Sequence, residues 1–371
     1  NISGNGTLNM YIPFVRSDLN GDMTAFTGTL NCLSSSGSEV ELRINHYKGL
    51  PNAHLVVNNS VSALNVSGTT IEIGALSGTG TLNGDENYKI GSKDTDSQFD
   101  GIIAAGSLTK SGDGVFTLTN NNTYAGPTVV NRGTLFVANK TGSATGTGDV
   151  NVKILATLSG DGIIGGNLTV DKNATIAPGS KNTGKFLSVE KSVTLKDGST
   201  FEVKTNPSFN LSDYLKVNES ITVSGKLKII NTTTREYFAG NEFKIFDCEN
   251  IYGTFEAIYP ETPGDDLIWN TSELYTKGII KVEAKTSASI LNTNSINVFP
   301  NPFNNNINIE NRTNEILEIS ISTLYGKTIL QTLTINKQTI TINLGTLNRG
   351  VYLLKAVGQN NTYYERIIKQ Q

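Results

Sequence analysis

Apolar and polar residues alternate in short runs along most of the chain. An apolar residue at every second position over four to six residues predicts a strand with one buried face. No stretch of helical length keeps a period of 3.6. The clearest runs are GVFTLT (114–119), TLFVAN (134–139), NLTVDK (167–172), SVTLKD (192–197) and SITVSG (220–225).

The segments between these runs are rich in Gly and Asn, which adopt the positive φ values that tight turns require. Short strands of similar length, separated by similar turns, indicate a coil of rungs. In such a coil each rung covers the apolar face of its neighbour.

Two landmarks recur in the first half of the chain. The tetrapeptide Ser-Gly-x-Gly begins at four serines, and the first three copies are followed by an aromatic-x-Gly step. A phosphate-binding loop would need a following helix, which the pattern does not provide, so we interpret these glycines as turn residues. We expect the aromatic residues of the repeats to lie in the core rather than to form a sugar platform. The serines are Ser3, Ser77, Ser111 and Ser159, and the aromatic residues are Phe26, Phe99, Phe116 and Tyr124.

Composition narrows the possible functions. The chain has 371 residues, of which only 17% are charged, and its net charge is −3. No Lys/Arg cluster is interleaved with aromatic residues, so we expect no nucleic-acid partner. No apolar run approaches the roughly 18–20 residues of a membrane-spanning helix. The chain begins at Asn1 without Met or an apolar leader, so we expect either that a leader was removed or that a longer protein precedes it.

Candidate chemistry is sparse. His46 and His54 are the only histidines, and neither a cysteine nor a nearby carboxylate completes a ligand set, so we expect both in surface loops. The aspartates of SDLNGD (17–22), Asp94 to Asp100 and Asp265–Asp266 are interpreted as turn residues with at most loose calcium binding. We therefore expect no metal, no cofactor and no catalytic residue.

The two cysteines, Cys32 and Cys248, could pair or could each be a buried thiol, and we favour buried thiols. Enzymes that cleave polysaccharides on a coil of rungs take their acids from neighbouring rungs. Linear spacing cannot reveal such a site, so a polysaccharide-binding or polysaccharide-degrading protein remains the alternative.

The segment LTKSGDGVFTLTNNNTYAGPTVVNRGTLFV (108–137) resembles the autotransporter-associated β-strand repeat of bacterial secreted proteins. Residues 213–283 are similar to the segment that commonly follows such repeats. The resemblance implies a right-handed parallel β-helix over residues 1–285, acting as a surface-exposed stalk or adhesive shaft. It leaves open that these residues only space out a missing amino-terminal domain.

A polar linker at 286–295 precedes a tail of different character, residues 296–371. Its period-two runs predict a small antiparallel β-sandwich of immunoglobulin-like type. Pro300 and Pro302 cannot donate ladder hydrogen bonds, so we expect them to hold the entry segment extended and outside the sheet interior. We expect Gly326 and Gly350 to stand where a β-carbon would be crowded.

The tail resembles the carboxyl-terminal sorting domain of the type IX secretion system of Bacteroidetes-type bacteria. The matching motifs, in order, are FPNPFNNNINI, ISTLYGKTI, LNRGVYLLKAV and YYERIIK. The resemblance implies export through the periplasm and the translocon, recognition by an outer-membrane shuttle β-barrel, and attachment to surface lipopolysaccharide or release. A surface glycan is a further potential partner. The residues it marks as the sorting signal are Pro300, Asn301, Pro302, Gly326, Gly350, Tyr352, Lys355, Arg366 and Lys369.

The sequence therefore predicts a secreted, non-enzymatic, structural or adhesin-like β-helix protein with a sorting tail. We hypothesise that the shuttle barrel binds the final strands and the Lys355–Lys369 region, because an edge strand offers backbone hydrogen bonds that need little sequence readout.

Overall fold

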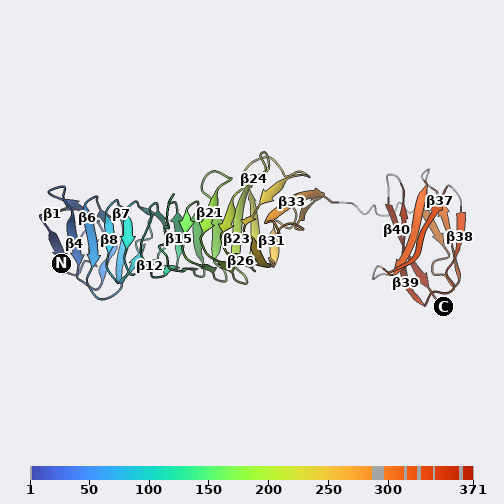
Figure 1. Ribbon diagram of the computed structural model, residues 1–371, viewed down its shortest axis with the longest axis horizontal. Helices are drawn as coiled ribbons and strands as arrows, with labels where there is room; N and C mark the ends of the chain where they lie inside the picture. The colour runs from blue at the N-terminus through green and yellow to red at the C-terminus, as the bar shows by residue number, and fades with distance from the viewer. Residues whose placement is uncertain are drawn as a thin grey trace. The chain divides into compact units, whose positions relative to one another are not determined.

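The computed structural model describes residues 2–285, 296–312, 316–323, 327–336, 339–358 and 362–370. The chain divides into two compact units, Asn1–Ala284 and Lys285–Gln371 (Figure 1). All regular elements in these ranges are strands. The part of the chain that is described thus contains no helix long and apolar enough to cross a membrane. The predicted all-β fold is confirmed.

The N-terminal unit is a parallel β-helix built from three stacks of strands. In the first stack every strand pairs in parallel with the strand one rung later. Its register aligns Phe116 with Leu135, Leu158 and Ile176, so the period-two pattern of each rung stays in phase with the next. The strands are β1 (Thr7–Ile12), β3 (Thr29–Ser34), β5 (Gly49–Val57), β7 (Ile71–Gly78), β10 (Ser97–Phe99), β13 (Val115–Leu118), β15 (Gly133–Val137), β17 (Ala156–Gly160), β20 (Thr175–Pro178), β23 (Thr200–Asn206), β27 (Lys226–Asn231) and β31 (Ala257–Tyr259).

The second and third stacks form the other faces, and they are also parallel. The second stack starts at β7 and continues through β9 (Asn87–Ile90), β12 (Ser107–Lys110), β14 (Thr128–Val130), β16 (Val150–Val152), β19 (Leu168–Val170), β22 (Val193–Leu195), β26 (Ser220–Val223) and β30 (Asn250–Gly253). The third stack has two parts. The first part is β2 (Arg16–Leu19), β4 (Val40–Ile44), β6 (Val61–Asn65), β8 (Thr81–Asn83) and β11 (Ile102–Ala104), and the second is β18 (Ile163–Ile164), β21 (Phe186–Val189), β25 (Tyr214–Val217) and β29 (Phe246–Asp247).

The N-terminal unit also contains antiparallel pairs in its C-terminal part. The short strand β24 (Leu211–Ser212) folds back on β23. Beyond the last rungs, β33 (Ile279–Ala284) pairs with both β28 (Glu242–Lys244) and β32 (Leu267–Asn270). Here the rings of Phe201, Phe246 and Phe255 stack with centroids 5.2–6.2 Å apart, which fills the end of the core.

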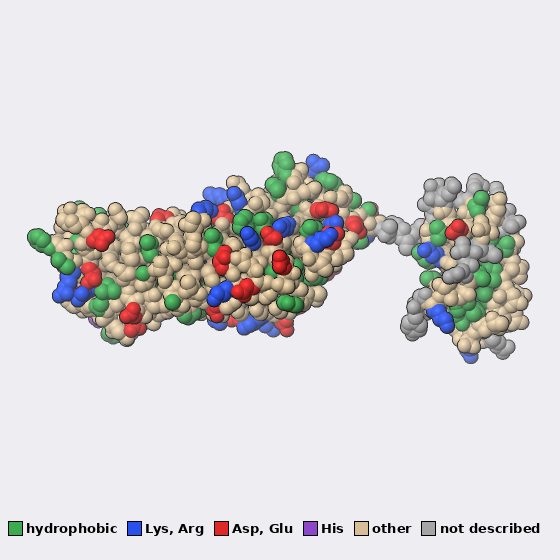
Figure 2. All heavy atoms as spheres, viewed as in Figure 1, with side chains coloured by type: hydrophobic (Ala, Val, Ile, Leu, Met, Phe, Trp, Pro, Cys, Tyr) green, Lys and Arg blue, Asp and Glu red, His purple; other side chains and the backbone are tan. Residues whose placement is uncertain are grey.

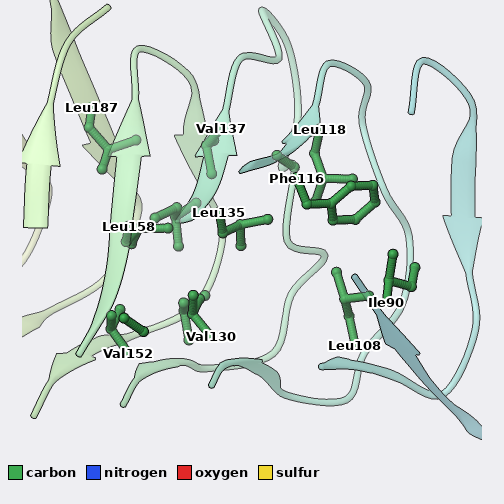
Figure 3. Close-up of a cluster of buried hydrophobic side chains, with 14 of the residues drawn as sticks. Ile90, Leu108, Phe116, Leu118, Val130, Leu135, Val137, Val152, Leu158 and Leu187 are labelled. Carbon is green, nitrogen blue, oxygen red and sulfur yellow. The ribbon is translucent and has the colours of Figure 1, made fainter. Parts of the chain in front are cut away.

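The core of the β-helix consists of the inward side chains of all three stacks. Figure 3 shows Leu135, Val137 and Leu158 from the first stack facing Val130 and Val152 from the second. The repeat aromatics Phe26, Phe99, Phe116 and Tyr124 are at most 3% exposed, which confirms that they belong to the core. Burying one such ring stabilises the fold by about 1.5–3 kcal/mol.

Close approach of successive rungs explains much of the glycine content. Gly106, Gly126, Gly148 and Gly166 stand in a column, where a β-carbon on any of the last three would lie 2.0 Å from the carbonyl oxygen of the glycine before it. The first glycine of each Ser-Gly-x-Gly copy has a positive φ, for example +69° at Gly112. Their interpretation as turn residues is confirmed.

The C-terminal unit is a sandwich of two antiparallel sheets, as predicted. One sheet has the order β34-β35-β38 and the other β37-β36-β39-β40. Their facing side chains form a separate core that includes Ile307, Ile319 and Leu354. The strands are β34 (Ile296–Phe299), β35 (Asn306–Asn311), β36 (Leu317–Thr323), β37 (Thr328–Ile335), β38 (Thr339–Asn343), β39 (Gly350–Val357) and β40 (Thr362–Lys369).

Candidate functional site

The Pro-Asn-Pro-Phe motif lies in the turn after β34, which itself joins its sheet as an edge strand. The side chain of Asn301 bridges two backbone groups of the last strand: its Nδ2 donates to the Arg366 carbonyl at 2.7 Å, and its Oδ1 accepts from the Ile368 N–H at 2.9 Å. Next to it, Phe303 N–H donates to the Ile368 carbonyl at 2.8 Å, and Gln370 N–H donates to the Phe303 carbonyl at 2.9 Å. The first motif of the tail thus covers the outer edge of β40, which would otherwise be open for strand addition.

Lys369 is buried by the same turn. Its side chain is 2% exposed, its ammonium donates to the Asn304 carbonyl, and it lies 5.8 Å from the centroid of the Phe303 ring. A buried ammonium needs such partners, because desolvation penalises an unpaired charge. Lys369, at the basic end of the sequence, therefore stabilises the fold of the tail.

The remaining sorting-signal residues divide between surface and interior. Tyr352 is buried, and its hydroxyl donates to the Asn348 carbonyl at 2.7 Å. Gly350 begins β39, and a β-carbon there would meet no atom closer than 3.9 Å, so the expectation of crowding is wrong. Gly326 lies outside the described residues. The exposed members are Pro300, Asn301, Pro302, Lys355 and Arg366.

Sequence reasoning missed Phe303, which is 1% exposed and anchors the turn. Its signal was available, because it is the apolar residue that directly follows the second proline.

Lys355 and Arg366 lie on the outward side of β39 and β40, and the Lys355 ammonium is 6.0 Å from the centroid of the Tyr364 ring.

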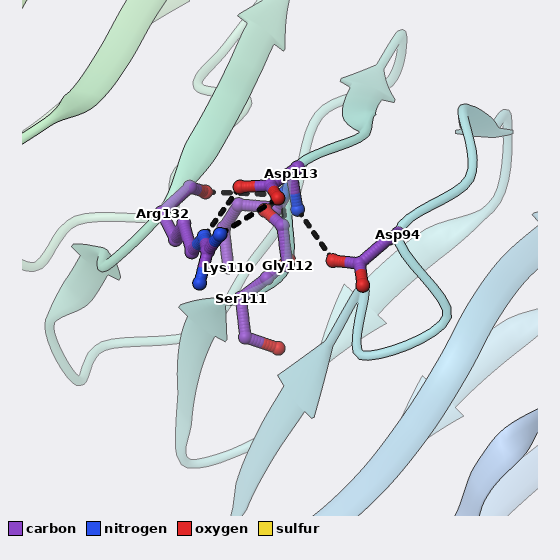
Figure 4. A network of polar contacts seen from close by, with 6 residues as sticks. All are labelled: Asp94, Lys110, Ser111, Gly112, Asp113 and Arg132. Carbon is purple, nitrogen blue, oxygen red and sulfur yellow. Dashed lines mark hydrogen bonds and ion pairs between the residues drawn. The ribbon is translucent and has the colours of Figure 1, made fainter.

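The repeat contains a buried lysine that the sequence did not reveal. Lys110 is 1% exposed, and its ammonium donates to the carbonyls of Ser111, Gly112 and Arg132 at 2.6, 2.7 and 3.1 Å (Figure 4). These bonds use all three protons of the ammonium. Burial lowers the pKa of Lys110 to about 8, against the opposing effect of the carboxylate of Asp113 and those of two further aspartates.

The acids beside Lys110 also join neighbouring rungs. Asp94 Oδ1 accepts from the Asp113 N–H at 2.7 Å, and the Asp113 carboxylate pairs with the Arg132 guanidinium at 2.8 Å. Asp96 Oδ1 accepts from the Val115 N–H at 2.8 Å. Hydrogen bonds and an ion pair between neighbouring rungs therefore account for the positions of Asp94, Asp96 and Asp113, and a bound ion is not needed to explain them.

The predicted loop position is right for His46 and wrong for His54. His54 lies in β5, half-buried, with its Nε2 2.8 Å from Ser77 Oγ. Burial and the nearby ammonium of Lys93 lower its pKa. In the described ranges no three His, Cys, Asp or Glu side chains gather in a way that could hold a metal ion.

Both cysteines are free thiols. Cys32 is buried as predicted, and burial raises its pKa to about 12. Cys248 is only half-buried, so the prediction of a buried thiol is wrong for it.

Asp213 is a further ionisable group that sequence reasoning did not single out. It is fully buried, and its Oδ1 accepts from the Lys185 N–H at 2.9 Å. Among the described residues its Oδ2 finds no hydrogen-bond partner. Burial raises its pKa.

Comparisons with known proteins match one family model in each of the two units. Residues 297–370 match the secretion system C-terminal sorting domain, and residues 108–137 match the passenger-associated-transport-repeat. The chain is 44% identical over 79 residues to the adhesin BmaC autotransporter of Brucella suis biovar 1 (strain 1330). That alignment covers 21% of this chain and 2% of the adhesin, so the chain matches only a small part of that much longer relative.

A structural similarity also extends over 86% of this chain and 24% of the chitinase ChiW of Paenibacillus sp. str. FPU-7, at 11% identity. With a TM-score of 0.20 it supports no conclusion about fold or activity.

These findings define a β-helix protein with a type IX secretion C-terminal sorting domain. Its place is the cell surface or the extracellular space.

Proposed function

We propose that the chain is a structural or adhesive shaft that a type IX system exports in a Bacteroidetes-type bacterium, with no catalytic role in the shaft. The observation that carries this proposal is the match of residues 297–370 to a sorting domain, on a unit with its own hydrophobic core. The adhesin-like repeat on a parallel β-helix supports the role of the shaft.

The partner in this proposal is an outer-membrane shuttle β-barrel, which hands the cargo on from the translocon. The contact surface is the outward face of β39 and β40. There the half-exposed side chains of Val351 and Leu353 lie beside the exposed Lys355 and Arg366. Figure 2 shows hydrophobic and basic side chains together on a face of this unit. Buried Lys369 is left out of the contact, and the turn at Asn301 and Phe303 covers the C-terminal part of the β40 edge, which shortens the edge available for strand addition.

A pull-down with residues 296–371 as bait tests this proposal in the secreting host. We expect capture of an outer-membrane barrel, and loss of capture with Lys355→Glu and Arg366→Glu together. The control is the double variant Asn306→Glu and Thr341→Glu, which adds acidic side chains at two exposed positions of the other sheet and should retain capture. Failure to capture any barrel would contradict the proposal.

The proposal that the shaft has no catalytic role is tested separately. Incubation of the chain with acidic and neutral polysaccharides, with and without calcium, should release no reducing ends and no unsaturated products. Sustained turnover of any of them would show that the shaft is an enzyme.

A further inference from the structure

A hollow of about 600 Å³ on the β-helix takes no part in the contacts described above. It crosses four successive rungs, and its walls come from the loops at 121–123 and 142–147, from Ile163 of β18 with the nearby Gly165, and from Glu190. Figure 2 shows that acidic and basic side chains on the visible face of this unit are interspersed, without a large patch of one sign.

Glycines make the hollow. Gly142, Gly146 and Gly165 line it without side chains, and the neighbouring rungs prevent any from being added. A β-carbon at Gly146 would lie 1.9 Å from the Tyr124 carbonyl oxygen, and one at Gly165 would lie 2.4 Å from that of Gly146. The depth of the hollow is therefore a consequence of rung spacing.

Side-chain hydrogen bonds hold the floor in place. Asn122, which is 3% exposed, donates to the Ala144 carbonyl at 2.6 Å and accepts from the Ile103 N–H at 2.7 Å. Ser143 Oγ accepts from the Gly165 N–H at 2.9 Å. A ligand that enters would meet a surface that is already ordered, which reduces the entropic cost of binding.

The exposed groups around this floor are polar and almost uncharged. Asn121, Thr123 and Thr147 are exposed and offer amide and hydroxyl groups. Glu190 is the one charged residue among those that line the hollow, and its carboxylate is oriented by the Asn218 amide at 2.7 Å.

An exposed aromatic ring lies on the same rung as Glu190, at the other end of strand β21. Strand β21 runs from Phe186 to Val189 and leads directly into Glu190, while its Ser188 pairs with Ile163 of the hollow. Phe186 and Glu190 are four residues apart in the chain, which spans at most about 13 Å at ~3.3 Å per residue. Phe186 is 40% exposed and stacks on Tyr214 with ring centroids 5.2 Å apart, so its orientation is fixed.

We propose that this hollow and Phe186 together bind a neutral polysaccharide chain. A sugar ring has an apolar C–H face, which packs on an aromatic ring, and an edge of hydroxyl groups, which pair with amide, hydroxyl and carboxylate groups. The single carboxylate disfavours a polyanionic chain. The inference rests on the proposed function, since it names the ligand class of the adhesive shaft.

Affinity electrophoresis of the full chain tests the site, in native gels that contain laminarin, galactomannan, xyloglucan or chondroitin sulfate. We expect at least one of the three neutral polysaccharides to retard the chain. Phe186→Ala should weaken that binding about tenfold. Thr147→Arg, which fills the hollow from an exposed position, should abolish it.

The matched controls lie on the second stack, away from the hollow. Tyr252→Ala removes an aromatic ring that is 58% exposed, and Thr222→Arg adds the same bulk at an exposed threonine. Both should bind within twofold of the unmodified chain, and all four variants should keep the same circular dichroism spectrum.

Three results would overturn the proposal: no retardation by any neutral polysaccharide, retardation by chondroitin sulfate alone, or binding that Phe186→Ala and Thr147→Arg leave unchanged. The assay uses purified chain and does not depend on export. Its failure can therefore be told apart from failure of the sorting tail.

Discussion

Burial of Asp213 makes the stability of the β-helix depend on pH. Its pKa is raised in the folded state, so its favourable contribution is complete below the unfolded pKa and is lost as the pH rises through the folded value. Asp213→Asn keeps an acceptor for the Lys185 N–H and removes the buried charge. We expect a higher melting temperature at pH 7 and no difference near pH 3, measured by thermal unfolding at a series of pH values.

Asp171→Asn is the control, because the contribution of Asp171 to stability depends on pH in the opposite direction. The carboxylate of Asp171 accepts from Lys196 at 2.6 Å and from Lys153 at 3.0 Å, and these ammonium groups lower its pKa. Its contribution is present above the unfolded pKa and is lost on acidification. This variant should be less stable at pH 7 and converge with the unmodified chain at low pH. A destabilised Asp213→Asn at pH 7 would contradict the account of Asp213.

Lys110 stabilises the turn of the repeat through backbone carbonyls. Lys110→Met keeps most of the side-chain volume and leaves three carbonyls without their donor. We expect a loss of about 1–3 kcal/mol in urea unfolding. Lys140→Met, at a lysine whose side chain is 72% exposed beside Asp161, should change stability by less than about 0.5 kcal/mol. Equal effects would show that Lys110 is not a structural cation.

At the scale of single elements, the glycine column sets the distance between rungs. Gly126 does not have a positive φ, so Gly126→Ala tests only the close approach of the preceding rung, where the new methyl group would lie 2.0 Å from the Gly106 carbonyl oxygen and 2.9 Å from the Ser107 β-carbon. We expect a loss of at least about 2–3 kcal/mol in denaturant unfolding. Gly6→Ala has nothing within 4 Å of the new methyl group and should be nearly neutral. A neutral Gly126→Ala would mean that the rungs can move apart at little cost.

In the sorting tail, the Asn301 side chain protects the outer edge of β40. Asn301→Ala removes both of its bonds to this edge, so the Ile368 amide should exchange with solvent at least tenfold faster in a hydrogen-exchange experiment. Asn308→Ala serves as the control, because the Asn308 side chain accepts from Thr341 on the other sheet. Unchanged exchange at Ile368 in the Asn301 variant would contradict the role of this turn.

Some of these features could be predicted from the sequence and others could not. Alternation predicted the strands and the buried aromatics, because each rung repeats the same local pattern. The Asn301–Arg366 and Lys369–Asn304 contacts join segments 65 residues apart, and no local pattern encodes them. The hollow at Glu190 was equally hidden, since it combines residues from four rungs. No local pattern marks Lys110 as buried, because it is the stacking of rungs that buries it.

At the scale of the whole molecule, each unit has its own hydrophobic core, and the residues that mark the sorting signal all belong to the second. A sorting signal carried by one folded unit should act on any passenger. The most direct test fuses residues 286–371 to an unrelated periplasmic passenger in a host with a type IX system. Protease accessibility on intact cells then reports the passenger's location. The account predicts a passenger at the cell surface or in the medium, and a passenger that remains in the periplasm would contradict it.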